Sequence, residues 1–76
     1  MLNMNESEWK KYAKNILKAE LRRRDISYEI LVKKLQAIGV DENYSSVNAK
    51  LNRGSFGFVF ALQCFKAIDA KDIRLD

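Results

Sequence analysis

The chain has 76 residues, a formal net charge of +4, no proline, one cysteine and no histidine. The length allows one domain with a small core, and a hydrophobic share of 47% argues against disorder. An intrachain disulfide, zinc sites built from His/Cys sets and nucleophile–histidine catalysis are all excluded. There is also no Gly-rich phosphate loop, so we expect no enzyme, no metal and no cofactor.

No apolar run approaches the roughly 20 residues of a membrane span, and no signal-peptide pattern opens the chain. We therefore expect a cytoplasmic protein that does not use a membrane. The positive charge concentrates in residues 1–26, which carry +3, while residues 27–54 carry +1 and residues 55–76 balance. A basic half fits a polyanionic partner, although a solvated lysine face on an ordinary helix explains it equally well.

Residues 1–76 are predicted to form a single domain in which residues 1–6 are frayed. A helix is predicted from Ser7 to about Arg24, with Asn5 or Ser7 as its N-cap. Its apolar stripe consists of Trp9, Tyr12, Ala13, Ile16, Leu17 and Leu21. A basic row, four residues apart at each step, consists of Lys10, Lys14, Lys18 and Arg22. Glu20 lies within the apolar stripe, so we expect it at the rim of the core, paired with a basic side chain.

The next helix is predicted to begin after Ser27, whose hydroxyl can accept from an amide of the first turn. Four residues at helical spacing form its apolar stripe: Ile30, Leu31, Leu35 and Ile38. Gly39 then provides the positive φ that ends a helix.

A third, short helix is capped by Asn43 or Ser45 and closed by Gly54. Its inward residues are predicted to be Tyr44, Val47 and Leu51. Its outward polar row is predicted to be Asn43, Ser46, Lys50 and Arg53. Two short helices around a Gly-containing turn are typical of a helix-turn-helix, although an αα-hairpin with a solvated face shows the same pattern.

The fourth helix is predicted from Phe56 to Ile68 and is apolar nearly all round. One side carries Phe58, Val59, Leu62, Phe65 and Ile68, and the other carries Phe56, Phe60, Cys64 and Ala67. A helix that is apolar on both sides is normally buried on both sides. We expect a homodimer whose interface is formed by Phe56, Phe60, Cys64, Ile73 and Leu75. The alternative is a monomer in which Trp9 and Tyr12 cover Phe60. The tail from Asp72 to Asp76 alternates like a short extended strand.

Residues 17–35 and 50–54 resemble the first two helices and the end of the recognition helix in phage-repressor and Cro-like helix-turn-helix domains. From Trp9 to Leu75 the chain more closely resembles a family of small bacterial proteins described as a domain of unknown function. The shared features are Lys-Ala-Glu-Leu at 18–21, Arg-Gly-x-Phe at 53–56 and Leu-Gln-Cys at 62–64. The resemblance implies an all-α, four- or five-helix repressor-like domain with a short extended C-terminal tail. The segment 36–43 is longer than the repressor turn.

The function predicted from these patterns is sequence-specific binding of double-stranded DNA by a small transcriptional regulator of bacterial, phage or mobile-element origin. The predicted DNA-binding residues are Ser27, Tyr28, Asn43, Tyr44, Ser45, Ser46, Lys50 and Arg53. The basic row of the first helix is a weaker candidate for DNA-backbone contacts, because it can lie on the opposite side of the domain. The alternative is a protein–protein interaction module, an inhibitor or adaptor, that uses its aromatic fourth helix.

Overall fold

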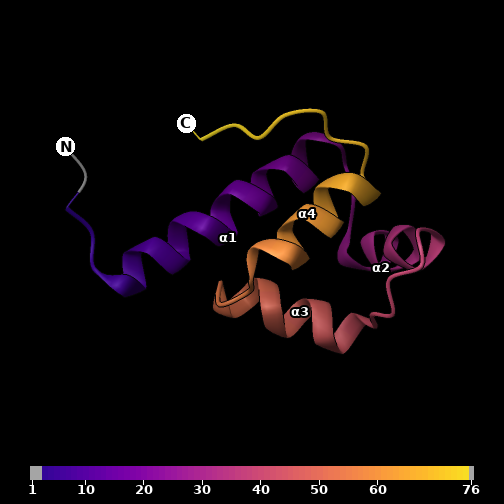
Figure 1. The fold of residues 1–76 in the computed structure, drawn as a ribbon, viewed down its shortest axis with the longest axis horizontal. Coiled ribbons are helices and arrows are strands. Elements are labelled where there is room, and N and C mark those ends of the chain that lie inside the picture. Colours follow the sequence, from indigo (N-terminus) through magenta and orange to yellow (C-terminus); the bar gives the residue numbers. More distant parts are fainter. Residues whose placement is uncertain (1–2, 76) are drawn as a thin grey trace.

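A computed structural model describes residues 3–75, and within that range the protein is all-α, with four helices and no strand. The helices are α1 (Glu6–Arg23), α2 (Tyr28–Ala37), α3 (Tyr44–Arg53) and α4 (Phe58–Ala67). In Figure 1, α1 is the long element, and α3 and α4 lie along one end of it with α2 beyond them. The prediction of an all-α domain is confirmed.

Helix α1 begins in a capping box. The Asn5 side chain accepts from the Glu8 amide at 2.9 Å, and the Glu8 carboxylate accepts from the Asn5 amide at 3.0 Å. Each side chain thereby satisfies an amide that the helix leaves without a partner. Of the two predicted caps, Asn5 is therefore correct. Glu6 belongs to the helix, so the predicted fraying of residues 1–6 is wrong for that residue, while Met1 and Leu2 lie outside the described residues.

Helices α1, α2 and α4 end in the same kind of turn, with a residue of positive φ just after the cap. That residue is Asp25 (φ 56°), Gly39 (φ 86°) and Asp69 (φ 62°), respectively. In each case the next amide donates back to the helix, as when Ile26 donates to the Leu21 carbonyl at 2.9 Å. This is the Schellman pattern, which satisfies carbonyls that would otherwise lack donors. Gly39 acts here as the sequence predicted.

The predicted N-caps of α2 and α3 are also confirmed. The Ser27 hydroxyl accepts from the Ile30 amide at 3.2 Å, and the Asn43 side chain accepts from the Ser46 amide at 2.8 Å. Helix α3 ends at Gly54, whose φ of 71° favours glycine. A second reason for glycine is space, because a Cβ there would collide with the backbone carbonyl of Lys10. Gly54 thus allows the end of α3 to touch α1.

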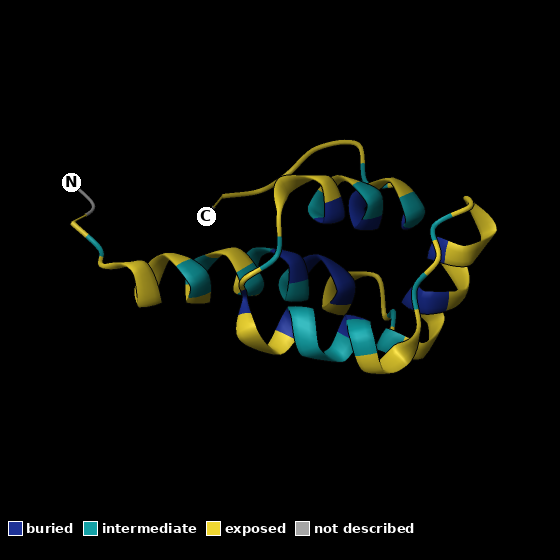
Figure 2. Ribbon diagram, turned by 60° about the horizontal axis from the view of Figure 1, so that its bottom comes forward, coloured by how far each residue is buried: buried dark blue, intermediate teal, exposed yellow. Residues whose placement is uncertain are grey.

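The core fills the space between the inner sides of the four helices, as Figure 2 shows in dark blue. Its apolar members are Leu17, Leu21, Leu31, Val32, Leu35, Val47, Leu51, Phe60, Cys64, Phe65 and Ile68. Several of the side chains that we predicted to point inward are instead exposed, among them Trp9, Ile30, Ile38, Tyr44 and Leu62. On α2, Val32 takes the inward position that Ile30 was expected to take, so the buried stripe is rotated relative to the prediction.

Helix α4 differs most from the prediction. It begins at Phe58 and its cap is Gly57, which contributes no side-chain hydrogen bond. Phe60 is 6% exposed and Cys64 is fully buried within the same chain, whereas Phe58 and Val59 are each 69% exposed. The premise that Phe60 and Cys64 need another subunit to cover them is therefore wrong. Trp9 and Tyr12 line a groove to which Phe60 does not contribute, and Trp9 is itself 48% exposed, so the alternative that they cover Phe60 is wrong as well. The cover comes from the chain around α3, including Phe56, whose ring centroid lies 5.6 Å from that of Phe60.

The C-terminal tail turns back after α4 and runs along α1 (Figure 1). Two hydrogen bonds hold it to α1. Arg24 Nη1 donates to the Ile68 carbonyl at 3.0 Å, and the Tyr12 hydroxyl donates to the Leu75 carbonyl. Arg24 Nε also donates to Glu20 at 3.0 Å, and Arg23 Nη2 lies 2.5 Å from the same carboxylate. Glu20 is 6% exposed, so the predicted ion pair at the rim of the core is confirmed.

Candidate nucleic-acid interface

Most side chains of the polar row predicted for α3 make contacts with other groups of the same chain. Lys50 Nζ lies 2.6 Å from Glu42 Oε2 and 4.6 Å from the centroid of the Phe60 ring. Asn43 caps α3, and its side-chain oxygen is occupied by the Ser46 amide. Lys50 therefore points toward α4 and holds the start of α3 in place.

The Glu42 carboxylate sits beside this contact with only 9% of its side chain exposed, and its Oε1 atom has no hydrogen-bond partner. Burial raises the pKa of Glu42, but the hydrogen bonds from Lys50 and Ser46 outweigh that effect and leave its pKa below the ordinary value. Burial, helped by the nearby Glu42 charge, raises the pKa of the Cys64 thiol to about 12. Cys64 is accordingly a packed hydrophobe rather than a reactive thiol.

The surface that α3 does expose is a different row. Tyr44 is 50% exposed, Asn48 is partly exposed and Asn52 is exposed, each four residues from the last. The Asn52 side-chain nitrogen donates to the Asn48 oxygen at 3.2 Å. Ser45 and Arg53 are also exposed and flank this row. Asn48 and Asn52 were not among the residues predicted to bind DNA, although their spacing of four residues from Tyr44 places them on the same side of the helix.

The basic row of α1 lies beside this exposed row of α3. Lys14 Nζ donates to the Asn52 carbonyl at 3.1 Å, and the Lys10 carbonyl faces Gly54 at the end of α3. Farther along α1, Lys18 and Arg22 reach the N-terminus of α2. We expected that the basic row of α1 can lie on the side of the domain opposite to α3. The structure instead places this row next to both the end of α3 and the start of α2.

Between α1 and α2 is an open hollow of about 520 Å³. Its polar lining comprises Lys18, Arg22, Asp25, Ser27 and Tyr28. The Tyr28 ring centroid lies 6.4 Å from that of Tyr44, and this contact links the N-termini of α2 and α3. Burial raises the pKa of Tyr28, while the charge of Arg22 acts in the opposite direction. Tyr28 thus stays a neutral hydrogen-bonding group next to two cations.

These contacts define one surface, which we call the polar face. It comprises Lys14, Lys18, Arg22, Ser27, Tyr28, Tyr44, Asn48 and Asn52. Of the residues predicted to bind DNA, the structure brings Ser27, Tyr28 and Tyr44 together there, with Ser45 and Arg53 at its edge on α3. Asn43, Ser46 and Lys50 are not part of it. The polar face combines cations, amides, hydroxyls and the start of a helix, which are the groups that hold phosphates and read base edges.

Two further findings concern residues 3–75. No helix in this range has the length and apolarity needed to cross a membrane. Within the same range, no group of three or more His, Cys, Asp or Glu side chains is close enough to hold a metal ion.

The chain belongs to a family described as a domain of unknown function (DUF6471), whose model matches residues 9–73. This confirms the membership that the motifs at 18–21, 53–56 and 62–64 indicated. Comparisons with curated proteins and with solved structures gave no match.

Proposed function

We propose that this protein binds double-stranded DNA through the polar face, as a small helix-turn-helix regulator. The observation that carries the proposal is the convergence of three elements. The cations Lys14, Lys18 and Arg22 of α1 lie on the same side as the start of α2 and the exposed amides of α3. A basic surface around an exposed polar helix is the arrangement that DNA-binding domains use, because phosphates supply most of the affinity and base edges supply specificity.

Each element has a role in this proposal. Lys14, Lys18 and Arg22 neutralise phosphates, and the free amides at the start of α2 hold a further phosphate next to Tyr28. Asn48 and Asn52 enter the major groove with α3, where an asparagine can pair with both N6 and N7 of adenine. Arg53 lies at the end of the same helix and reaches the DNA backbone or a guanine. The segment 38–43 between α2 and α3 is longer than the usual helix-turn-helix turn of 3–4 residues. In this proposal α3 therefore enters the major groove at an angle different from that of a helix-turn-helix with the short turn.

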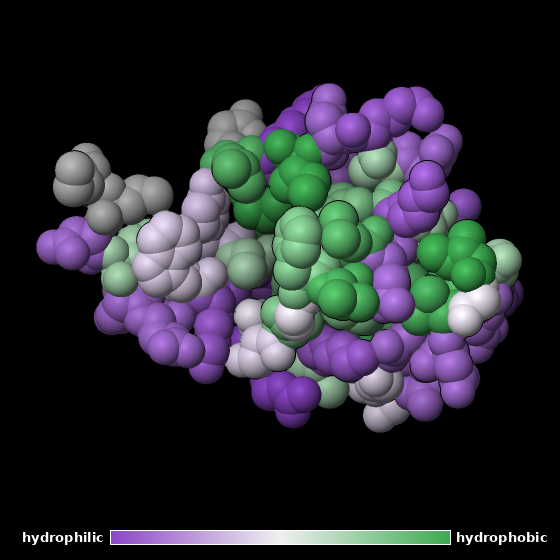
Figure 3. Space-filling view, viewed as in Figure 1, coloured by the Kyte–Doolittle hydropathy of each residue, from purple (hydrophilic) through white to green (hydrophobic). Residues whose placement is uncertain are grey.

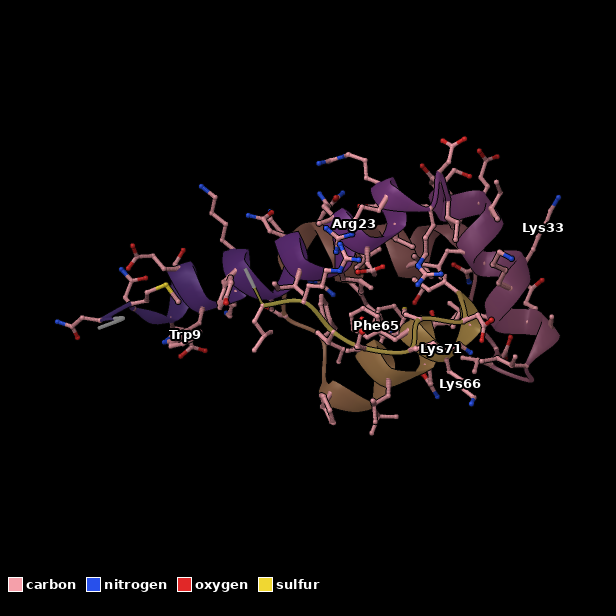
Figure 4. All side chains as sticks on the ribbon, turned by 90° about the horizontal axis from the view of Figure 1, so that it is seen from above. Trp9, Arg23, Lys33, Phe65, Lys66 and Lys71 are labelled. Carbon is pink, nitrogen blue, oxygen red and sulfur yellow. The ribbon has the colours of Figure 1, made fainter. Side chains whose placement is uncertain are left out.

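The first test is selection of bound sequences from a random duplex library, followed by binding measurements at increasing salt. Replacing both cations of the hollow, Lys18→Gln and Arg22→Gln, removes two phosphate contacts. It should reduce the slope of log affinity against log salt by about 1.8, at roughly 0.9 per contact. The matched control is Lys66→Gln with Lys71→Gln, which removes the same charge from α4 and the tail; Figure 4 labels both lysines. If both double variants reduce the salt slope equally, binding depends only on the net charge of the protein and not on the position of these cations.

The second test concerns sequence reading. Asn48→Ala and Asn52→Ala should each relax the selected motif at one position, with a loss of about 1–3 kcal/mol on the preferred site. Lys33→Gln on α2 is the control, since Lys33 is exposed, projects outward from α2 (Figure 4) and does not line the hollow; this variant should change neither the motif nor the affinity. If no duplex binds in a salt-dependent way, or if no enriched sequence emerges, the proposal is wrong.

A protein–protein module is the second candidate, and the exposure of Phe58, Val59 and Leu62 on α4 favours it. In that case the protein is an inhibitor or adaptor whose contacts lie away from the polar face. The double substitution at Lys18 and Arg22 then leaves the biological activity intact, whereas a charge placed at Phe58 abolishes it.

A further inference from the structure

An apolar groove separates α1 from α4 on the side of α1 away from the polar face. It encloses about 540 Å³ and is closed along one edge by the C-terminal tail. Its walls include Trp9, Tyr12 and Ile16 from α1, Phe58 and Phe65 from α4, and Leu75 from the tail. None of the described side chains that line it carries a charge. Contact between such an apolar groove and water is unfavourable, and exposed apolar surfaces of this kind usually mark an interaction site.

Beside the groove, α4 presents a ridge. Phe58 and Val59 are each 69% exposed, and Leu62, one turn farther on, is 47% exposed. Phe58 belongs to both features, since it forms a wall of the groove and projects from the ridge. In Figure 3, which shows this side of the molecule, hydrophobic residues gather over α4 and beside the tail.

We infer that this face binds a second copy of the chain, so that the ridge of each copy enters the groove of the other. A two-fold interface uses the same patch on both subunits, so the patch must be complementary to itself. A projecting aromatic ridge next to an apolar hollow meets that requirement. The cations Lys14, Lys18 and Arg22 lie on the opposite side of α1 and are therefore kept away from the contact.

The exposed area is consistent with a dimer. The apolar side chains that remain partly exposed on this face are Trp9, Phe58, Val59, Leu62, Ile73 and Leu75. Together they offer on the order of 600 Å², the upper end of the largest patch on a typical monomer and near the roughly 800 Å² per partner of a standard interface. This interface differs from the predicted one, because Phe60 and Cys64 are buried within the chain, while Ile73 and Leu75 remain in it.

The protein contains its own reporter for this contact. Trp9 is the single tryptophan, it lines the groove and it is 48% exposed. Light scattering after size exclusion, from micromolar to submillimolar concentration, gives the mass. Acrylamide quenching of Trp9 fluorescence over the same range reports whether the groove is covered. We expect twice the chain mass at high concentration, with quenching that weakens as the dimer forms.

Phe58→Glu should hold the protein at the monomer mass and keep Trp9 readily quenched at every concentration. Because Phe58 is mostly exposed, this variant should fold, which circular dichroism checks. Ile38→Glu is the control, since Ile38 is a 47% exposed apolar residue at the end of α2, and it should leave the dimer intact. A monomer at all concentrations would overturn the inference and leave the groove to a different protein. A dimer that forms without protecting Trp9, or that survives Phe58→Glu, would overturn it as well. None of these outcomes depends on DNA binding.

Discussion

The two sides of α1 differ in how closely a neighbouring helix packs against them. On the side of the polar face, α1 and α3 touch through backbone, where Gly54 meets the Lys10 carbonyl, and Lys14 reaches the Asn52 carbonyl. On the other side, a groove lined by aromatic and aliphatic residues separates α1 from α4. A glycine lets two helices approach each other closely, whereas large side chains hold them apart. The difference indicates that one side is complete within the chain and that the other is left open.

The largest expected effect separates the two sides of α4. Phe60 is buried beneath Lys50, whereas Phe58, at the edge of the groove, is 69% exposed. Phe60→Ala should lower the free energy of unfolding by about 3–5 kcal/mol, because it leaves a cavity in the core. Phe58→Ala should change it by no more than about 0.5 kcal/mol. Chemical denaturation at low protein concentration measures both variants, and equal losses would mean that Phe58 is also part of the core.

Gly54→Ala probes the closed side of α1. The new Cβ meets both an unfavourable φ and the Lys10 carbonyl, so we expect a loss of about 2–4 kcal/mol. Gly39→Ala is the control, because its φ is also positive but no atom lies within 4 Å of the added carbon. It should cost only about 1 kcal/mol. Thermal or urea unfolding compares the two, and similar losses would show that the close approach of α1 and α3 contributes nothing.

Glu20 tests how the end of α1 is fixed to the end of α4. The hydrogen bond from Arg23, and then that from Arg24, hold the pKa of Glu20 below its ordinary value of 4.5 despite burial. Its stabilisation is therefore complete above about pH 4.5 and is lost as the pH falls through the lowered pKa of the folded state. Glu20→Gln should cost about 1–2 kcal/mol at neutral pH, since both arginines are partly exposed.

The same substitution should flatten the loss of stability below pH 4.5, which urea unfolding at several pH values measures. Glu6→Gln is the control, because Glu6 forms only an exposed ion pair with Lys10 at 3.9 Å, and we expect no change from it. An unaltered pH profile in Glu20→Gln would place the acid sensitivity elsewhere, with Glu42 as the next group to replace.

The smallest expected effect lies at the turn where the tail begins. Asp69 has a φ of 62°, a conformation that costs most residues about 1–2 kcal/mol and aspartate less. Asp69→Gly should raise the free energy of unfolding by about 0.5 kcal/mol and keep the tail on α1. Asp69→Asn should have no effect, because asparagine tolerates the same conformation. A loss of stability in the glycine variant would indicate that the exposed ion pair between the Asp69 carboxylate and Lys71 Nζ, 3.9 Å apart, contributes to stability.

The local signals in the sequence were sufficient for both ends of α2 and of α3, but not for the start of α4, which is Phe58 rather than Phe56. Ser27, Asn43, Gly39 and Gly54 act where the sequence placed them, because caps and positive φ depend on a few neighbouring residues. The orientation of α4 was not predictable in the same way. A segment that is apolar on every side has no periodicity to show which side is buried. Its buried side is set by the position of α3, a tertiary contact.

The polar face was predictable in part. Tyr28 could be placed because it begins a helix, but the prediction that Tyr44 points inward is wrong, and the direction of Lys50 could not be predicted. A lysine in a polar row normally points to solvent, and here the buried Glu42 carboxylate and the Phe60 ring draw it inward. Asn48 and Asn52 belong to the polar face because Lys14 contacts the Asn52 carbonyl and Asn52 is hydrogen-bonded to Asn48. Nothing in the sequence fixes the direction in which α1 crosses α3, so this contact was not predictable.

Cys64 is the one thiol in the chain, and it is fully buried with a pKa of about 12. Its sulfur reacts with an alkylating reagent only when the core opens, and at neutral pH almost none of it is thiolate until then. The rate of labelling by a small maleimide therefore measures the opening rate of the native protein, or the population of open molecules when reclosing outpaces the chemistry. Maleimide labelling of Cys64, followed by mass spectrometry, can therefore report the unfolding of the native protein without any substitution in the chain.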